Sequence, residues 1–195
     1  MTKTFTILSL TLLIIGCSDS PRIKQATQKN ETVPTSSQES LDSLRSPFHE
    51  AYYSDISLRE FGQLVLDDSV QPMDNPKTFQ LMDSILSPSK ETRDYYYPIF
   101  QYIIGKADGA LGEVVGIYTK KYVEQYSKEF FERYACFEET ESCYDELKRM
   151  ATFVGFEIQV QDNPEKSFTS LKEIIRNDNK VVKAFLKLIS NKTSL

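Results

Sequence analysis

Few polar side chains in this 195-residue sequence stand at the spacings that catalytic or metal sites require. His49 is the single histidine, and no G-x-S-x-G or similar nucleophile signature accompanies it, so a serine or cysteine hydrolase is not indicated. The acidic run at 138–146 lacks the Asp-x-Asp-x-Asp-Gly loop that arranges Ca²⁺ ligands, and we interpret it as a solvated loop that leads into a helix. A glycosidase that uses two well-placed carboxylates needs no such motif and stays open as an alternative.

Glycines form a second conspicuous group, because four of the seven lie in the segment GKADGALGEVVG at 105–116. A phosphate-binding loop would follow G-x-x-x-x-G-K-[ST], but Phe100 replaces its first glycine and Ala107 replaces its hydroxyl residue. The spacings of four, three and four residues instead place these glycines on one helix face, where the missing side chains let another helix approach closely. The four glycines are Gly105, Gly109, Gly112 and Gly116.

Aromatic side chains could contact a glycan or a peptide. Five of them follow at intervals of four: Tyr118, Tyr122, Tyr126, Phe130 and Tyr134. Four such steps rotate a helical row by about 160°, so the row predicts core contacts with two neighbouring helices and not one flat platform. Tyr95, Tyr96 and Tyr97 point in three directions on a helix, which exposes at least one ring. These three tyrosines are therefore the candidates for binding a partner.

The N-terminal segment MTKTFTILSLTLLIIGC has the form of a secretory leader. Its apolar run from Phe5 to Ile15 covers about 11 residues, whereas a membrane-spanning helix needs roughly 20. The ending Ile14-Ile15-Gly16-Cys17 resembles the lipobox of bacterial lipoproteins. This resemblance implies cleavage before Cys17, lipidation of its thiol and acylation of its new amino group. Ser18 at the next position is similar to an outer-membrane sorting signal.

The other two cysteines are expected to pair with each other. With Cys17 committed to lipid, Cys136 and Cys143 remain, in a compartment where disulfides persist. A bridge that encloses so short a loop would contribute roughly 2 kcal/mol if the geometry permits closure, and two free thiols are the alternative. Zinc would need two more ligands, which neither a C-x-x-C motif nor a histidine pair supplies. We therefore predict a disulfide, no metal site and no cofactor.

Composition divides the chain into three parts. We expect a signal peptide at 1–16, a flexible tether at 17–46 that is rich in Ser, Thr, Gln and Asn, and a single helical domain at 47–195. The whole chain has 28 acidic and 23 basic residues, and the domain has 24 and 18 of these. This acidic balance argues against nucleic acid as a partner, and it leaves attachment to the membrane to the lipid on Cys17.

Apolar residues in the domain recur with the period of a helix and almost never with that of a strand. About seven helices are predicted, at 57–65, 75–86, 91–104, 108–134, 142–160, 163–175 and 181–189, with Pro98 expected to kink or split the third. The segments at 77–86 and 166–175 are alike, and Asp-Asn-Pro precedes each of them. They are 89 residues apart, and half of this distance is close to the repeat length of HEAT and armadillo units. Chance similarity of two well-capped helices is the other explanation. The predicted fold is all-α, either stacked helical hairpins of HEAT or armadillo type or an irregular helical bundle.

These observations favour a noncatalytic protein-interaction or scaffold module, anchored by lipid in the bacterial cell envelope. We expect it at the outer membrane, either periplasmic or exposed on the surface, with an envelope protein or peptide as its partner. The alternative is an envelope hydrolase that acts on glycan through paired carboxylates. The sequence names neither a partner nor a substrate.

Overall fold

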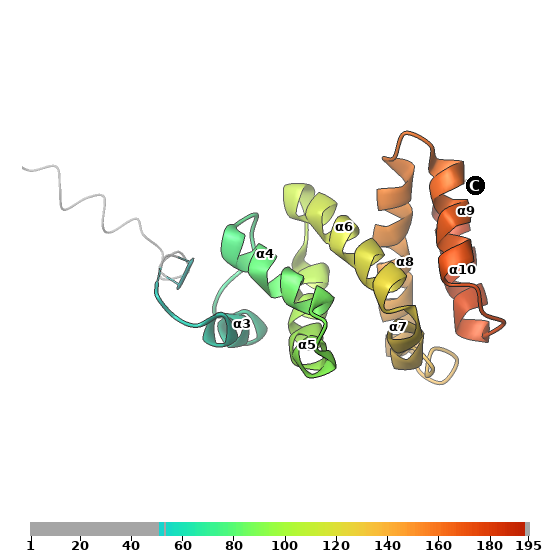
Figure 1. Cartoon of the computed structure of the whole chain (residues 1–195). Coiled ribbons are helices and arrows are strands. Elements are labelled where there is room, and N and C mark those ends of the chain that lie inside the picture. The colour runs from blue at the N-terminus through green and yellow to red at the C-terminus, as the bar shows by residue number, and fades with distance from the viewer. Residues whose placement is uncertain (1–50, 53, 194–195) are drawn as a thin grey trace, which may run out of the picture. The chain divides into compact units, whose positions relative to one another are not determined.

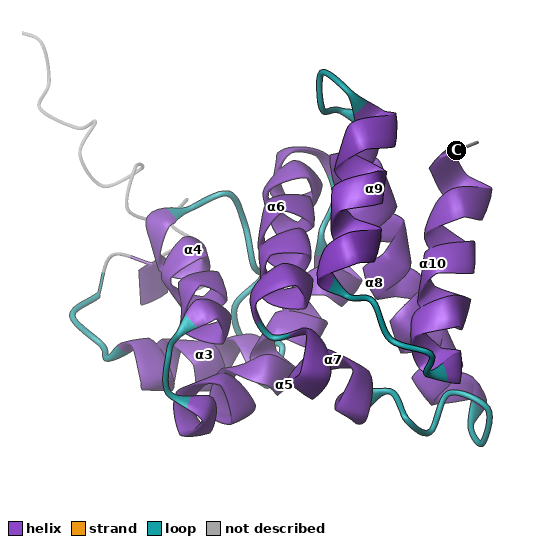
Figure 2. Cartoon of the chain, turned by 45° about the vertical axis from the view of Figure 1, so that its right-hand side comes forward, coloured by secondary structure: helices purple, strands orange, loops and turns teal. Residues whose placement is uncertain are grey.

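The computed structural model of the chain, shown in Figure 1, describes residues 51–52 and 54–193. All of them belong to one compact unit that spans Glu39–Leu195. Within the described residues the regular structure is entirely helical, as Figure 2 shows, which confirms the all-α prediction. The elements are α3 (Leu58–Leu66), α4 (Pro76–Asp83), the short 3₁₀ helix η1 (Ser84–Leu86), α5 (Lys90–Lys106), α6 (Gly109–Gln125), α7 (Ser127–Arg133), α8 (Glu141–Gln159), α9 (Pro164–Ile174) and α10 (Lys180–Thr193).

Side-chain caps fix where several helices begin. At α3 the Ser57 hydroxyl accepts a hydrogen bond from the backbone N–H of Glu60, and the Glu60 carboxylate accepts one from the N–H of Ser57, which completes the predicted capping box. Asn75 and Asn163 cap α4 and α9 more simply, because the side-chain oxygen of each accepts one hydrogen bond from a backbone N–H of the first turn. Each of these two helices then has proline at its first position, where a missing N–H costs no hydrogen bond.

The helix predicted at 108–134 is divided into α6 and α7 by a bend at Tyr126, whose φ and ψ are −128° and 37°. Hydrogen bonds of helical spacing continue on both sides of the bend, from Tyr126 N–H to the carbonyl of Tyr122 and from Phe130 N–H to that of Tyr126. The Tyr126 hydroxyl also donates to the carbonyls of Leu86 and Ser87, which ties the bend to the end of η1. Pro98 does not split its helix, because α5 continues through it without a break.

The helices pack mainly against elements close to them in the chain. α5 contacts α3, α4 and η1, α6 contacts η1 and α4, and α8 lies between α6 and α10 and also contacts α9. Figure 1 shows this succession from α3 and α4 at one end of the described residues to α9 and α10 at the other. Large side chains fill the space between the helices, and the largest fully buried ones are Tyr122, Tyr134, Phe61, Phe100, Phe130 and Phe185.

Glycine allows α6 to lie close to α8, as its spacing predicts. A Cβ atom placed on Gly116 would be 3.3 Å from the carbonyl oxygen of Phe153, and one on Gly112 would be 3.8 Å from the Phe153 ring. Gly109 serves another purpose, because it opens α6 with a φ of +40°, a conformation that other residues rarely adopt. Gly105 lies in α5, so the prediction that the four glycines share one helix face is wrong, because the chain turns between α5 and α6.

Candidate functional site

The three tyrosines singled out as binding candidates lie in the first half of α5 and differ in exposure. Tyr97 is buried, its hydroxyl 2.6 Å from that of Tyr134. Tyr95 and Tyr96 are half-buried, with their rings in edge-to-face contact at 4.9 Å between centroids. The guanidinium of Arg59, on α3, lies 4.1 Å from the centroid of the Tyr95 ring. Two of the three candidates therefore reach the surface, beside an arginine, and Tyr97 belongs to the interior.

Beside these tyrosines α5 carries a charged side chain that points inward. Arg93, on the second turn of α5, has only 7% of its side chain exposed. One of its terminal nitrogens donates to the carbonyls of Ser87 and Pro88, at 2.7 and 3.0 Å. Its other terminal nitrogen and Nε donate to the carboxylate of Glu129 on α7, with a shortest distance of 2.6 Å. Arg93 therefore connects the start of α5 both to the residues just before this helix and to α7.

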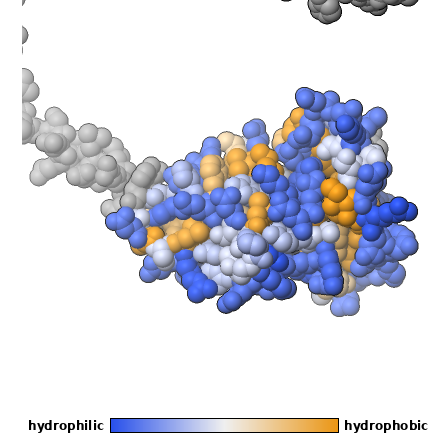
Figure 3. All heavy atoms as spheres, in the orientation of Figure 1, coloured by the Kyte–Doolittle hydropathy of each residue, from blue (hydrophilic) through white to orange (hydrophobic). Residues whose placement is uncertain are grey.

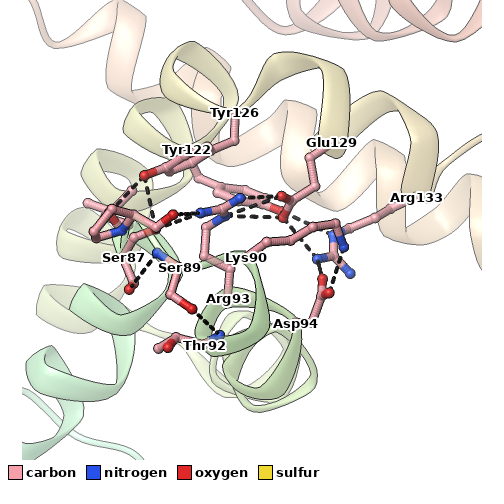
Figure 4. A network of polar contacts seen from close by, with 12 residues as sticks. Ser87, Ser89, Lys90, Thr92, Arg93, Asp94, Tyr122, Tyr126, Glu129 and Arg133 are labelled. Atoms are coloured by element: carbon pink, nitrogen blue, oxygen red, sulfur yellow. Dashed lines mark hydrogen bonds and ion pairs between the residues drawn. The ribbon is translucent and has the colours of Figure 1, made fainter.

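Two more side chains donate hydrogen bonds to the Glu129 carboxylate, as Figure 4 shows. The hydroxyl of Tyr122, on α6, donates to Glu129 at 2.8 Å. Arg133, one turn further along α7, donates to the same carboxylate at 3.0 Å, to the Tyr122 hydroxyl at 3.0 Å and to Asp94. We call this group of Arg93, Asp94, Tyr122, Glu129 and Arg133 the Arg–Glu cluster. It joins α5, α6 and α7 at the point where the chain bends.

The electrostatics of the Arg–Glu cluster keep its central carboxylate ionised. Burial of Glu129, whose side chain is 12% exposed, opposes ionisation, but the hydrogen bonds from Arg93, Arg133 and Tyr122 outweigh burial and lower its pKa to about 2. Burial raises the pKa of Tyr122, so this phenol remains protonated and serves as a donor. A carboxylate in this state accepts hydrogen bonds and is a poor source of protons at neutral pH.

A second polar group lies next to the cluster. The side-chain amide of Gln101 donates to the hydroxyls of Tyr97 and Tyr134 at 2.7 and 2.8 Å, while its own oxygen is buried without a hydrogen-bond partner. Burial raises the pKa of Tyr97 to about 12, and the hydrogen bonds from Tyr134 and Gln101 only partly offset it. The guanidinium of Arg133 lies 4.2 Å from the Tyr97 ring centroid, which connects the two groups. These phenols therefore act as neutral hydrogen-bonding groups that join α5 to the end of α7.

The row of five aromatics predicted to form core contacts does so. Tyr122, Phe130 and Tyr134 are fully buried. Tyr118, the first of the row, and Tyr126, its middle member, are half-buried, and the Tyr118 hydroxyl donates to Asp83 at 2.7 Å. The bend at Tyr126 alters the direction of the row, so the second half faces α10 through the contact of Phe130 with Phe185. The aromatic row is therefore part of the contacts that hold neighbouring helices together.

Open depressions flank this region. One of about 380 Å³ lies over the Arg–Glu cluster. It is lined by Lys90, Arg93, Gln125, Tyr126, Ser127, Lys128, Glu129 and Glu132. Arg93 and Glu129 are already bonded to each other there and offer no free charge to a ligand.

Another depression, of about 340 Å³, lies between α6 and the start of α9. Its lining residues include Lys120, Glu124 and Gln161, and the Gln161 amide donates to the nearby Glu157 carboxylate at 2.5 Å. Burial raises the pKa of Glu157, and the negative charge of Glu124 adds to this effect, while Lys120 opposes it. Glu157 is therefore a carboxyl group whose environment favours the protonated form.

Of the predicted cysteine sites, the disulfide lies within the described residues. Cys136 and Cys143 are bonded, with their Cα atoms 6.0 Å apart, which confirms the pairing. The bridge links the turn after α7 to the first turn of α8. In the acidic loop between them Glu138 pairs with Lys180 at 3.2 Å. Cys17, the predicted lipidation site, and His49 lie outside the described residues.

Sequence reasoning missed the Arg–Glu cluster. Its one local signal is the spacing of four between Glu129 and Arg133, which by itself is typical of an exposed ion pair on a helix. Arg93 is 36 residues away from Glu129 in the chain, and no motif connects them.

The chain matches no model of a known protein family, no curated protein and no solved structure. In the part of the chain that the structure describes, no helix combines the length and apolar character needed to cross a membrane. Nor do three or more His, Cys, Asp or Glu side chains gather there in a way that would hold a metal ion.

Proposed function

We propose that this chain is a lipid-anchored protein of the bacterial cell envelope, located at the outer membrane, whose helical domain is a noncatalytic module for binding another protein. The leader ending Ile14-Ile15-Gly16-Cys17 supports the anchor, since the acyl chains on Cys17 would hold the protein on a bilayer. The disulfide between Cys136 and Cys143 agrees with an oxidising envelope compartment.

The observation that carries the choice of binding over catalysis is the pairing of Glu129. Arg93, which is buried, and Glu129, whose side chain is 12% exposed, are bonded to each other, and the pKa of Glu129 is held at about 2. An acid catalyst at neutral pH needs a carboxyl group with a raised pKa. The cluster instead stabilises the junction of α5 with α7, which is a structural role.

The proposed contact surface is formed by Tyr95, Tyr96 and Arg59. Tyrosine and arginine are the residue types that contribute most to binding at protein interfaces, because each combines a large contact area with hydrogen-bonding groups. The acidic balance of the domain, with 24 acidic and 18 basic residues, favours a neutral or basic partner.

The anchor is tested by Cys17→Ser in the full chain. We expect the variant to remain unprocessed or to leave the detergent phase, because the leader offers no other thiol for lipid attachment. Mass spectrometry of the wild-type N-terminus would show the acylated cysteine directly. Detergent partitioning that is unchanged in the variant, together with an unmodified Cys17, would contradict the anchor.

The contact surface is tested with Tyr95→Ala and Tyr96→Ala in pull-downs from detergent-solubilised envelopes, quantified by mass spectrometry. A specific partner should be recovered with the wild type and lost in these variants, by roughly tenfold if each ring contributes about 1.4 kcal/mol. Tyr144→Ala is the matched control, since Tyr144 is a tyrosine on α8 with 39% of its surface exposed. Equal loss in the control would assign the effect to folding, and equal recovery in all variants would contradict the surface.

A second candidate is a glycan hydrolase. It is favoured by the raised pKa of Glu157, which lies near Glu124 and near the depression between α6 and α9. Glycoside hydrolysis uses a carboxyl group with a raised pKa together with a second carboxyl group nearby. Turnover of envelope glycan by the wild type that Glu157→Gln abolishes, with Glu165→Gln as an exposed control, would establish this activity and displace the noncatalytic proposal.

A further inference from the structure

Three large apolar side chains are exposed where α6 meets α8. Ile117 is 39% exposed, Phe156 45% and Val160 60%. The helices touch along a line through Gly116, which lies against Phe153 and Glu157 of α8. Ile117 follows Gly116 by one residue, about 100° further around α6 and away from its buried side. Phe156 and Val160 lie on the outward side of α8, roughly opposite the buried Ile158 and Val154. We call these three residues the α6–α8 strip.

Basic side chains border the α6–α8 strip in a domain that is acidic overall. Lys121 follows Ile117 by one turn on α6, and Lys148 and Arg149 are exposed on α8 before Phe156. None of these three cations forms an ion pair with a described residue. The acidic residues next to the strip along the two helices are Glu113, one turn before Ile117 on α6, and Glu157, which follows Phe156 on α8. Exposed apolar groups beside unpaired cations are the combination that binds at the interface of an anionic bilayer.

We propose that the α6–α8 strip docks on the surface of the bilayer that holds the lipid anchor. Phe156 and Val160 enter the interfacial region, and Lys148 and Arg149 contact anionic headgroups. The inference rests on the lipid anchor proposed above and adds a defined orientation of the domain to it.

The size of the strip and the length of the tether favour a bilayer over a protein as its occupant. Even a large aromatic residue buries only about 150–250 Å², and the three side chains of the strip are 39–60% exposed, so together they offer far less than the roughly 800 Å² per partner of a stable protein interface. On the face shown in Figure 3, apolar residues likewise form small separate patches in a mostly hydrophilic surface. The 30 residues at 17–46 cannot reach further than about 100 Å even when fully extended, so a lipid on Cys17 would keep the domain near the bilayer. Weak contacts are sufficient under these conditions, because the tether raises the effective concentration.

The test uses a tryptophan reporter, because the natural chain has no tryptophan. Full-length lipidated Phe156→Trp is reconstituted into phosphatidylcholine vesicles with and without phosphatidylglycerol, and its emission is followed with brominated lipids as quenchers. We expect a blue shift and quenching that increase with phosphatidylglycerol. Ile174→Trp, at a 50% exposed position on α9, is the matched control and should show neither change.

Charge reversal provides a second variant that does not disturb the apolar residues. Arg149→Glu in the Phe156→Trp background should lower the ratio of docked to undocked domain on anionic vesicles by roughly thirtyfold, which corresponds to about 2 kcal/mol at 1.4 kcal/mol per tenfold. Flotation of the vesicles reports the anchor independently and should be unchanged.

Several outcomes would overturn the proposal. Normal flotation with identical emission from Phe156→Trp and Ile174→Trp would leave the anchor in place and refute docking. A shift that follows the density of protein in the vesicles instead of the lipid charge would identify a second copy as the occupant. A shift that requires added envelope protein would identify a protein partner. Loss of flotation in the wild type would refute the anchor, and docking with it.

Discussion

Replacement of Glu129 by glutamine removes the negative charge at the centre of the Arg–Glu cluster while keeping the side chain nearly isosteric. Arg93, with 7% of its side chain exposed, and Arg133, with 22%, then lose their shared counter-charge. Breaking a buried ion pair by removing one partner typically costs about 3–5 kcal/mol. The pKa of Glu129 provides an independent figure, because lowering it from 4.5 to about 2 corresponds to roughly 3 kcal/mol of stabilisation at neutral pH.

The pH dependence of this effect follows from the direction of the pKa shift. A carboxyl group with a lowered pKa in the folded state stabilises fully above its unfolded value of about 4.5, and that stabilisation is lost as the pH falls toward 2. By pH 3 the wild type should have lost about 2 of the roughly 3 kcal/mol. The glutamine variant lacks this titration, so the two proteins should differ by about 3 kcal/mol at pH 7 and about 1 kcal/mol at pH 3.

Urea denaturation followed by circular dichroism at the two pH values measures both differences. At pH 7 the loss should also lower Tm by roughly 10 °C for a domain of this size. Glu132→Gln is the control on the same helix, because Glu132 is 64% exposed and pairs with Lys128 only at 3.9 Å. It should change the free energy of unfolding by less than about 0.5 kcal/mol. A loss below about 1 kcal/mol for Glu129→Gln, or a loss that is the same at both pH values, would refute the electrostatic account of the cluster.

Reduction of the disulfide, or Cys136→Ser with Cys143→Ser, should lower the free energy of unfolding by about 2 kcal/mol, and thiol titration of the oxidised, denatured protein should detect neither cysteine. Gly116→Ala should destabilise by about 1–2 kcal/mol, because the new Cβ would lie 3.3 Å from a carbonyl oxygen of α8. Gly112→Ala, with its nearest contact at 3.8 Å, should be neutral or stabilising by up to about 1 kcal/mol; thermal unfolding of the pair would contradict the packing argument if both changed Tm equally. Asn163→Ala removes the cap that accepts from the N–H of Lys166 and should cost about 1 kcal/mol in the same assay, whereas an unchanged Tm would show that the cap is dispensable.

Local features of the chain were predictable because their causes lie within one turn of helix. The capping box at Ser57 and the Asn-Pro starts at Asn75 and Asn163 use neighbouring residues. The end of α8 was less clear, because 156–160 alternates like a strand, and helix was favoured there since a lone strand would have no partner. The glycine spacing predicted that some helix would pack closely here, but it did not identify α8 as the helix that contacts Gly116.

The bend at Tyr126 was not foreseen because nothing in its own segment requires it. The aromatic row continues through this position with unbroken spacing, and neither glycine nor proline interrupts it. The groups that stabilise the bend come from elsewhere in the chain: the carbonyls of Leu86 and Ser87 accept from Tyr126, and the guanidinium of Arg93 lies 3.8 Å from its ring centroid. Hydrophobic periodicity describes only the local segment, so it cannot predict a bend that is caused by contacts with residues distant in the chain.

The same segment of α5 explains why the Tyr95–Tyr97 run was predicted only in part. Arg93 and Tyr97 are one turn apart and face α6 and α7, whereas Tyr95 and Tyr96 lie toward α3, where Arg59 covers one ring. Exposure within the run is therefore decided by which neighbour each side chain meets. It follows that the Arg–Glu cluster and the proposed contact surface share one helix, and the cluster fixes the position of that helix against α7. The cluster can therefore support binding by holding Tyr95 and Tyr96 in place, without touching the partner itself.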